Sequence, residues 1–163
     1  MRDEKWIRLK FQKGFTLVEL AVVTGIIVTL LGFITVNLVR SQQMVSLTSV
    51  EEILLADLKQ QQLKAMIGDT EGRPTPDSYG IHFDPNRYVT FHSSTYSSSD
   101  TSNSAINLES NMQFNSPGFN IIFSKLSGEI PTATIIELKD NTNSKLKRIY
   151  LNIYGTVTQV ESL

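Results

Sequence analysis

The feature that most constrains this chain is an apolar run at residues 15–39, in which Glu19 is the single charged residue. As an α-helix the run is roughly 37 Å long, enough to cross a hydrocarbon layer of about 30 Å with some tilt. It is too long for the apolar core of an ordinary secretory signal, and no small-x-small cleavage site follows it. The sequence therefore predicts a membrane-spanning helix that stays in the mature protein.

The charges that flank the run predict its orientation. Residues 1–14 carry five basic and two acidic side chains, and the run is followed directly by Arg40. Because positively charged flanks stay on the cytoplasmic side, we expect residues 1–14 in the cytoplasm and most of the chain beyond the membrane. A plain single-pass anchor explains this topology, but it does not explain the residues at the start of the run.

Those residues form the motif KGFTLVEL at positions 13–20. The motif, with its basic leader and long apolar run, resembles the processing site of type IV prepilins and pseudopilins. The resemblance implies that a membrane-embedded prepilin peptidase cleaves between Gly14 and Phe15, and that the new N-terminal Phe15 is N-methylated. Gly14 has no side chain, so its backbone can enter a peptidase site without a steric barrier. Cleavage there leaves the apolar run in the mature chain.

Glu19 has two interpretations. A carboxylate in a membrane helix costs about 2.5–3.5 kcal/mol at mid-bilayer and less near the interface, where water and the helix dipole stabilise it. Alternatively Glu19 pairs with a cation. The resemblance implies that this cation is the N-terminal amine of a neighbouring subunit or of its own chain, and such pairing would set the axial register during assembly. Residues 15–39 contain no proline, so no proline-dependent kink is expected.

Helical periodicity continues beyond the apolar run. Apolar residues recur at three- and four-residue steps, no proline occurs before Pro74, and Gly68 is a helix-stop signal. The apolar stripe consists of Leu47, Val50, Leu54 and Leu58. We therefore expect a helix from about residue 15 to 67, with a transmembrane half at 15–39 and an amphipathic half at 40–67 that needs a cover.

Residues 68–163 are expected to supply that cover as a β-rich head. Short β-prone runs occur at 79–83, 88–92, 120–124, 133–138, 148–154 and 156–160. Residues 93–104, SSTYSSSDTSNS, are poor in apolar side chains and predict a mobile loop. The expected class is α+β, a long N-terminal helix packed by its second half on an antiparallel sheet. This order resembles the pilin fold, and FSKLSGEI, TIIEL and RIYLNIYGTV resemble the GspH/FimT group.

The sequence offers no catalytic constellation. It contains no cysteine, no phosphate-binding loop, no HExxH motif and no nucleophile elbow. We expect neither enzymatic activity, nor a cofactor, nor a metal site. His82 and Asp84 are two residues apart on one expected strand and can share a face; we interpret them as sheet residues rather than an acid–base pair.

One basic cluster is a candidate nucleic-acid contact. The turn at residues 140–144 is surrounded by Lys139, Lys145, Lys147 and Arg148. A basic hairpin tip can contact phosphates, and some minor pilins related to this group bind DNA during uptake. The alternative is a solvated, charged turn: Asp140 offsets part of the charge, no aromatic cluster offers stacking, and the net charge of -1 indicates no general affinity for nucleic acid.

The resemblance thus implies a minor pilin or pseudopilin of a type IV pilus or type II secretion filament. It would lie in the inner membrane as a single-pass protein before joining an extracytoplasmic filament. Its partners would be prepilin peptidase and other pilin subunits. Two alternatives stay open: a DNA-binding minor pilin of a competence system, and a membrane-anchored protein that forms no filament.

Overall fold

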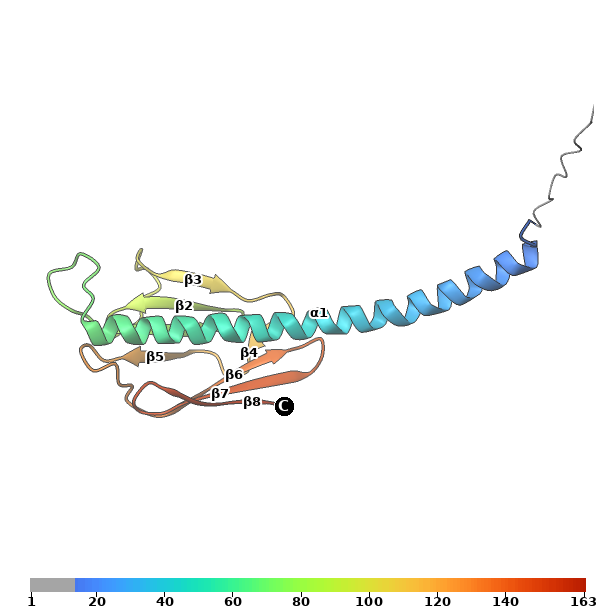
Figure 1. The fold of residues 1–163 in the computed structure, drawn as a ribbon. Helices are drawn as coiled ribbons and strands as arrows, with labels where there is room; N and C mark the ends of the chain where they lie inside the picture. Colours follow the sequence, from blue (N-terminus) through green and yellow to red (C-terminus); the bar gives the residue numbers. More distant parts are fainter. Residues whose placement is uncertain (1–13) are drawn as a thin grey trace, which may run out of the picture. The chain divides into compact units, whose positions relative to one another are not determined.

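The computed structural model describes residues 14–163, with the side chains of residues 14–32 and 47–163. The predicted leader lies outside the described residues except for Gly14. The chain divides into two compact units, Met1–Gln43 and Met44–Leu163, and we call the second unit the head. Helix α1 is Leu17–Ile67 (Figure 1).

Within the described residues, no helix combines the length and the hydropathy of a membrane span. The span predicted from sequence, residues 15–39, includes residues 33–39, whose side chains lie outside the described residues.

Helix α1 ends in a glycine-dependent cap. Gly68 has a φ of 66°, in the left-handed region that glycine adopts readily. The Gly68 N–H donates to the Ala65 carbonyl at 3.2 Å, and the Asp69 N–H donates to the Lys64 carbonyl at 3.0 Å. These two bonds form a Schellman motif, which satisfies carbonyls that the end of a helix leaves free. The helix therefore stops where Gly68 in the sequence indicates.

The head is built from two four-stranded antiparallel sheets. The first sheet has the order β3-β2-β1-β5, and the second has the order β4-β6-β7-β8. The strands are β1 Tyr79–Asp84, β2 Arg87–His92, β3 Ser104–Asn107, β4 Met112–Phe114, β5 Phe119–Phe123, β6 Thr134–Asp140, β7 Lys145–Leu151 and β8 Val157–Ser162. The expected α+β class with antiparallel pairing is confirmed, but the strands form two sheets, and β3 and β4 were not among the predicted runs.

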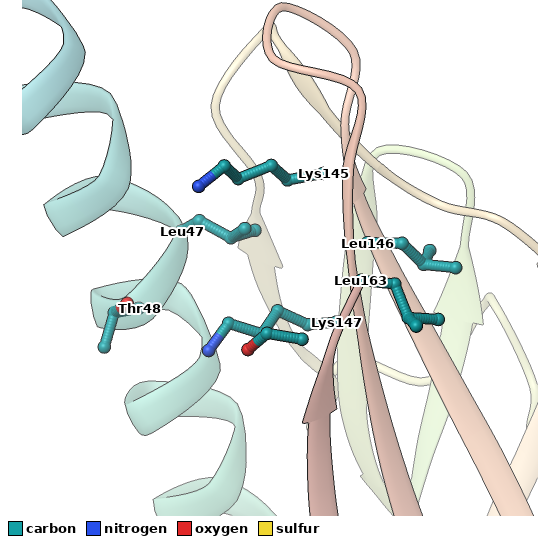
Figure 2. Close-up of a pocket in the computed structure, with 7 residues that line it drawn as sticks. Leu47, Thr48, Lys145, Leu146, Lys147 and Leu163 are labelled. Atoms are coloured by element: carbon teal, nitrogen blue, oxygen red, sulfur yellow. The ribbon is translucent and has the colours of Figure 1, made fainter.

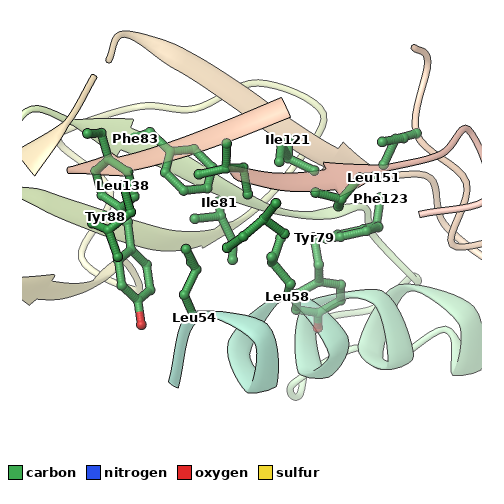
Figure 3. Close-up of a cluster of buried hydrophobic side chains, with 14 of the residues drawn as sticks. Leu54, Leu58, Tyr79, Ile81, Phe83, Tyr88, Ile121, Phe123, Leu138 and Leu151 are labelled. Carbon is green, nitrogen blue, oxygen red and sulfur yellow. The ribbon is translucent and has the colours of Figure 1, made fainter. Parts of the chain in front are cut away.

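The core of the head lies between the apolar stripe of α1 and the inner faces of both sheets (Figure 3). Leu47, Leu54 and Leu58 are buried as predicted, and Val50 is partly buried against the same cluster. The opposing side chains include Tyr79, Ile81 and Phe83 from β1, Tyr88 from β2, Ile121 and Phe123 from β5, Leu138 from β6 and Leu151 from β7. Burial of this stripe holds the second part of α1 on the sheets.

Two carboxylates of α1 add polar links to the sheets. The Tyr88 hydroxyl donates to Asp57 Oδ2 at 2.6 Å, which joins α1 to β2. Burial raises the pKa of Tyr88, and this hydrogen bond to Asp57 raises it further. Lys147 Nζ lies 2.7 Å from Glu51 Oε2, which joins α1 to β7. Each sheet therefore has a polar link to the helix beside the apolar core.

Residues 93–103, which belong to the segment 93–104 expected to be a mobile loop, make aromatic contacts with the first sheet, and Ser104 begins β3. The Tyr96 ring stacks on His82, with centroids 4.0 Å apart and 10° between the planes. It also lies 5.3 Å from the ring of Phe91. Side chains alternate between the two faces along a strand. Phe83 belongs to the core, so its neighbour His82 points away from α1; Tyr88 also belongs to the core, so Phe91, three residues further along β2, points away from α1 as well. One aromatic residue thus anchors a polar segment to the outer face of the first sheet.

Substituting the most buried leucine of the stripe tests this account of the core. Leu54 is 0% exposed, whereas its neighbour Ile53 is 52% exposed. We expect Leu54→Ala to lower the free energy of unfolding by about 2–5 kcal/mol through lost burial and a residual cavity. Ile53→Ala, the matched control, should change it by no more than about 0.5 kcal/mol. Urea unfolding of the full chain in detergent measures both, and equal effects would contradict this core.

Candidate processing and assembly site

The first turn of α1 is closed by a capping box. The Glu19 N–H donates to Thr16 Oγ1 at 3.2 Å, and the Thr16 N–H donates to Glu19 Oε2 at 2.9 Å. The Thr16 hydroxyl also donates to Glu19 Oε2, at 2.8 Å. This reciprocal T-x-x-E pattern satisfies two backbone N–H groups that would otherwise lack partners. No role was predicted for Thr16, although the spacing of Thr16 and Glu19 is the signature of this cap.

The bond predicted to be cleaved lies outside the capped turn. Gly14, Phe15 and Thr16 precede the helix, and both Gly14 and Phe15 are exposed. Neither Gly14 nor Phe15 contributes an atom to the capping bonds, so a break between them leaves the cap unchanged. A Cβ added to Gly14 would meet no heavy atom within 4 Å. The described fold therefore places no requirement for glycine at this position.

The cap also leaves part of the Glu19 carboxylate available. The bonds to Thr16 use Oε2, and Oε1 accepts no hydrogen bond from the described residues. Oε2 serves the local cap, while Oε1 can accept a further hydrogen bond. Both interpretations of Glu19 stay predictions.

The described first part of helix α1, Leu17 to residue 32, exposes apolar side chains all around its axis. The large exposed side chains between the cap and residue 32 are Leu17, Val18, Leu20, Val22, Val23, Ile26, Ile27, Val28, Leu30 and Leu31. The two threonine hydroxyls donate to backbone carbonyls of the same helix, Thr24 to Leu20 at 2.9 Å and Thr29 to Ile26 at 2.8 Å. This surface is suited to an environment without water, such as lipid or neighbouring apolar helices.

The four basic residues predicted as a nucleic-acid contact lie on two faces of the second sheet. Lys147 is opposite the buried Leu138, whereas Arg148 is opposite Glu137. By alternation, Lys145 shares the face of Lys147. Figure 2 shows both lysines reaching from β7 toward α1 beside Leu47, where they line a pocket of about 300 Å³.

Lys139, the fourth residue of the cluster, shares the opposite face with Arg148. Two of the four cations already have acidic partners. Lys147 pairs with Glu51, and Arg148 Nε lies 2.7 Å from Glu137 Oε1. The structure therefore does not gather the four residues into one surface.

Asp140 stabilises the turn between β6 and β7. It is 1% exposed and accepts hydrogen bonds from the Thr142 N–H and from the side-chain amides of Asn143 and Asn111. Burial opposes ionisation, but these bonds together hold the pKa of Asp140 below its usual value. Asp140 thus has a structural role in the turn rather than simply offsetting the charge of the nearby lysines.

His82 and Asp84 do share the outer face of β1, as the sequence indicated. His82 Nε2 lies 3.2 Å from Asp84 Oδ1, and Nδ1 lies 2.6 Å from Asn120 Oδ1. Among the described residues, no group of three or more His, Cys, Asp or Glu side chains is arranged to hold a metal ion.

A substitution at Lys147 tests whether this lysine stabilises the fold through its pair with Glu51. Lys147 and Glu51 are both largely buried side chains, and removing one partner leaves a poorly solvated charge. We expect Lys147→Met to lower the free energy of unfolding by about 3 kcal/mol, and the double variant Lys147→Met/Glu51→Leu to recover most of that loss. Lys139→Met, on the opposite face, is the control and should change little. Urea unfolding checks all three; equal stability of Lys147→Met and the parent chain would contradict the pairing.

No protein-family model matches this chain, and comparison with curated proteins and with solved structures finds no similar protein.

Proposed function

We propose that this protein is a minor pilin or pseudopilin, a structural subunit of a type IV pilus or type II secretion-type filament. In this proposal a prepilin peptidase removes residues 1–14, Phe15 is N-methylated, and the subunit assembles through the helix at residues 15–39. The observation that carries the proposal is the exposed Gly14–Phe15 link, followed directly by a capped apolar helix with one carboxylate, Glu19. The long helix with its second part on antiparallel sheets is the pilin fold in this interpretation.

Cleavage before Phe15 creates the cation that Glu19 requires. The new N-terminal amine is positively charged, and methylation preserves that charge. It lies one residue before Thr16, whose N–H remains bonded to Glu19 Oε2. The remaining oxygen, Oε1, can then accept a bond from the amine of the same chain or of a neighbouring subunit. Such a pair is far stronger in lipid than in water, because less solvent screens it.

The apolar surface of the helix supplies the general driving force for assembly. The described residues 15–31 expose large apolar side chains on every side. In the membrane these are covered by lipid, and in a filament they would be covered by equivalent helices of sister subunits. Close packing of helices alone leaves their axial position poorly defined, whereas a paired carboxylate and amine define it. We therefore propose that Glu19 sets the axial register between neighbouring helices, and that its apolar neighbours hold the helices together.

Glu19→Gln tests this assignment, because it removes the charge and retains an oxygen that can accept the capping bonds. In cells that naturally produce the protein, we expect normal removal of residues 1–14 but at least several-fold less of the variant in the sheared filament fraction. Since the chain has no cysteine, a single Val28→Cys reporter also measures helix–helix contact by disulfide cross-linking. Cross-linking between copies, or to equivalent single-cysteine sister subunits, should fall in parallel.

Thr16→Val is the matched control for the cap, because it removes the threonine hydroxyl and leaves the carboxylate charged. We expect its incorporation to exceed that of Glu19→Gln. Normal incorporation of Glu19→Gln would refute the register role of the charge. Equal losses in both variants would instead assign the effect to the helix cap.

The two alternative functions receive no specific support from the described residues. The DNA-uptake interpretation needs a shared basic surface, and Lys147 and Arg148 lie on opposite faces with acidic partners of their own. A plain membrane anchor requires neither a cleavage site at Gly14 nor a carboxylate at Glu19.

A further inference from the structure

Helix α1 and strand β2 face each other through two rows of polar side chains. On the helix the row recurs at steps of four and three residues, and on the strand it recurs at every second residue, so each row keeps to one face. The side chains are Asp57, Gln61 and Lys64 of α1 and Tyr88, Thr90 and His92 of β2. These steps advance the helix by about 4.5–6 Å and the strand by about 6.6 Å, so the two rows stay nearly in step.

The first pair of these rows is in direct contact, and the next pair leaves a pocket. The Tyr88 hydroxyl reaches the helix and donates to Asp57 Oδ2 at 2.6 Å. Thr90 has a shorter side chain than Tyr88, and beside it lies a pocket of about 100 Å³ that Gln61 lines from the helix side. Ser104 of β3, which pairs with Thr90 in the sheet, lines the same pocket.

Gln61 is the side chain of this pocket that most requires a partner. It is 5% exposed, and its amide makes no hydrogen bond with any other described residue. A buried amide without hydrogen bonds is unfavourable, because it has given up those it made with water. The amide has two donor hydrogens and an acceptor oxygen. A molecule in the pocket that both donates and accepts would therefore satisfy Gln61.

Other groups of the lining also keep hydrogen-bonding capacity. The Thr90 hydroxyl donates to the Ser104 carbonyl at 3.4 Å, and the Ser102 hydroxyl donates to Asp100 Oδ1 at 2.7 Å. Each of these hydroxyl oxygens can still accept a bond. The Ser104 hydroxyl and the buried His92 Nδ1 have no hydrogen-bond partner in the described part of the chain. The pocket thus presents donors and acceptors together.

The fixed charges of the lining cancel. Lys64 and Glu71 both line the pocket, and Lys64 Nζ lies 2.6 Å from Glu71 Oε1. An anion in the pocket would lie near the Glu71 carboxylate, and a cation would lie near the Lys64 amine, so neither sign of charge is favoured. The electrostatics therefore suit a neutral molecule.

The size of the pocket limits what can enter it. A volume of about 100 Å³ corresponds to about three water-sized groups at roughly 30 Å³ each. Ser102 and Ser104 are exposed, so the pocket opens to solvent on their side, and a larger molecule can place one end inside. A hydroxyl group both donates and accepts. Neighbouring hydroxyl groups on a short carbon chain or on a sugar ring therefore match the size and the polarity of this pocket.

We propose that this pocket binds neighbouring hydroxyl groups of a neutral polyol or sugar. The Gln61 amide donates to one ligand oxygen and accepts from another, and the hydroxyls of Thr90 and Ser104 hold the same molecule from the sheet side. The site lies within the head, and it depends neither on cleavage after Gly14 nor on filament assembly.

Nuclear magnetic resonance of the full chain tests the proposal. The chain is held in micelles of an amine-oxide detergent, which carries neither hydroxyl nor phosphate groups, and is titrated separately with glycerol, glucose and inorganic phosphate. The side-chain amide of Gln61 and the backbone amides of Thr90 and Ser104 report binding. We expect saturable shifts with glycerol or glucose, at a dissociation constant on the order of 1 mM for so few contacting atoms, and no saturable shift with phosphate.

Gln61→Leu replaces the amide by an apolar side chain of similar size. Because this amide has no partner in the described chain, the variant should keep the fold and weaken binding by about tenfold or more, measured at the backbone amides of Thr90 and Ser104. Gln60→Leu is the matched control, because Gln60 is the preceding residue of α1 and is exposed; its affinity should equal that of the parent chain. Tighter binding of glucose would assign a sugar, and tighter binding of glycerol a free polyol.

Shifts that do not saturate with either hydroxylated probe would overturn the proposal and assign the pocket to solvent water. Equal affinity in Gln61→Leu and the parent chain would overturn it as well, as would preferred binding of phosphate. If Gln61→Leu does not fold, Thr90→Val supplies the test, because it removes one hydroxyl with little change of shape. That variant should bind several-fold more weakly, and an unchanged dissociation constant would contradict the site.

Discussion

In its described residues, helix α1 carries more apolar surface than the described chain covers. In the head, one apolar stripe of the helix is buried against the inner faces of both sheets. In the described residues 15–31, large apolar side chains are exposed on every side, and the hydroxyls of Thr24 and Thr29 are bonded within the helix. Water does not favour such a surface. Such a surface is suited to lipid or to other helices, and the filament proposal provides both in turn.

The polar groups of α1 fix the position of each sheet along the helix, which non-directional apolar burial alone would not determine. Asp57 bonds the Tyr88 hydroxyl of the first sheet, and Glu51 pairs with Lys147 of the second, so each sheet has a defined place on the helix. Glu19 closes the first turn through Thr16 and keeps one oxygen available. In each case a specific charge or hydrogen bond fixes a geometry that non-directional burial permits but does not select.

Much of the helix could be predicted from sequence, because its signals are local. The spacing of Leu47, Leu54 and Leu58 indicated the buried stripe, and Gly68 marked the helix end. The T-x-x-E cap could equally have been predicted from the sequence, although no role was predicted for Thr16. Other features depend on contacts between distant residues. Strand β4 has three residues, too few for a periodic pattern. The contact of residues 93–103 with the first sheet is made by Tyr96, which stacks on the distant His82. Similarly, the basic residues 139, 145, 147 and 148 are close together in the sequence. Strand alternation places them on two faces of the second sheet, and Glu51 pairs with Lys147.

In the proposed function, this chain is processed at Gly14 and enters assembly through the helix that follows. The mass of the full-length protein, purified from cells that contain a prepilin peptidase, tests it most directly. The account predicts a mature chain that lacks residues 1–14 and begins at Phe15 with one added methyl group, and it predicts that Gly14→Leu retains the leader. A native protein that still begins at Met1 in such cells would contradict the account.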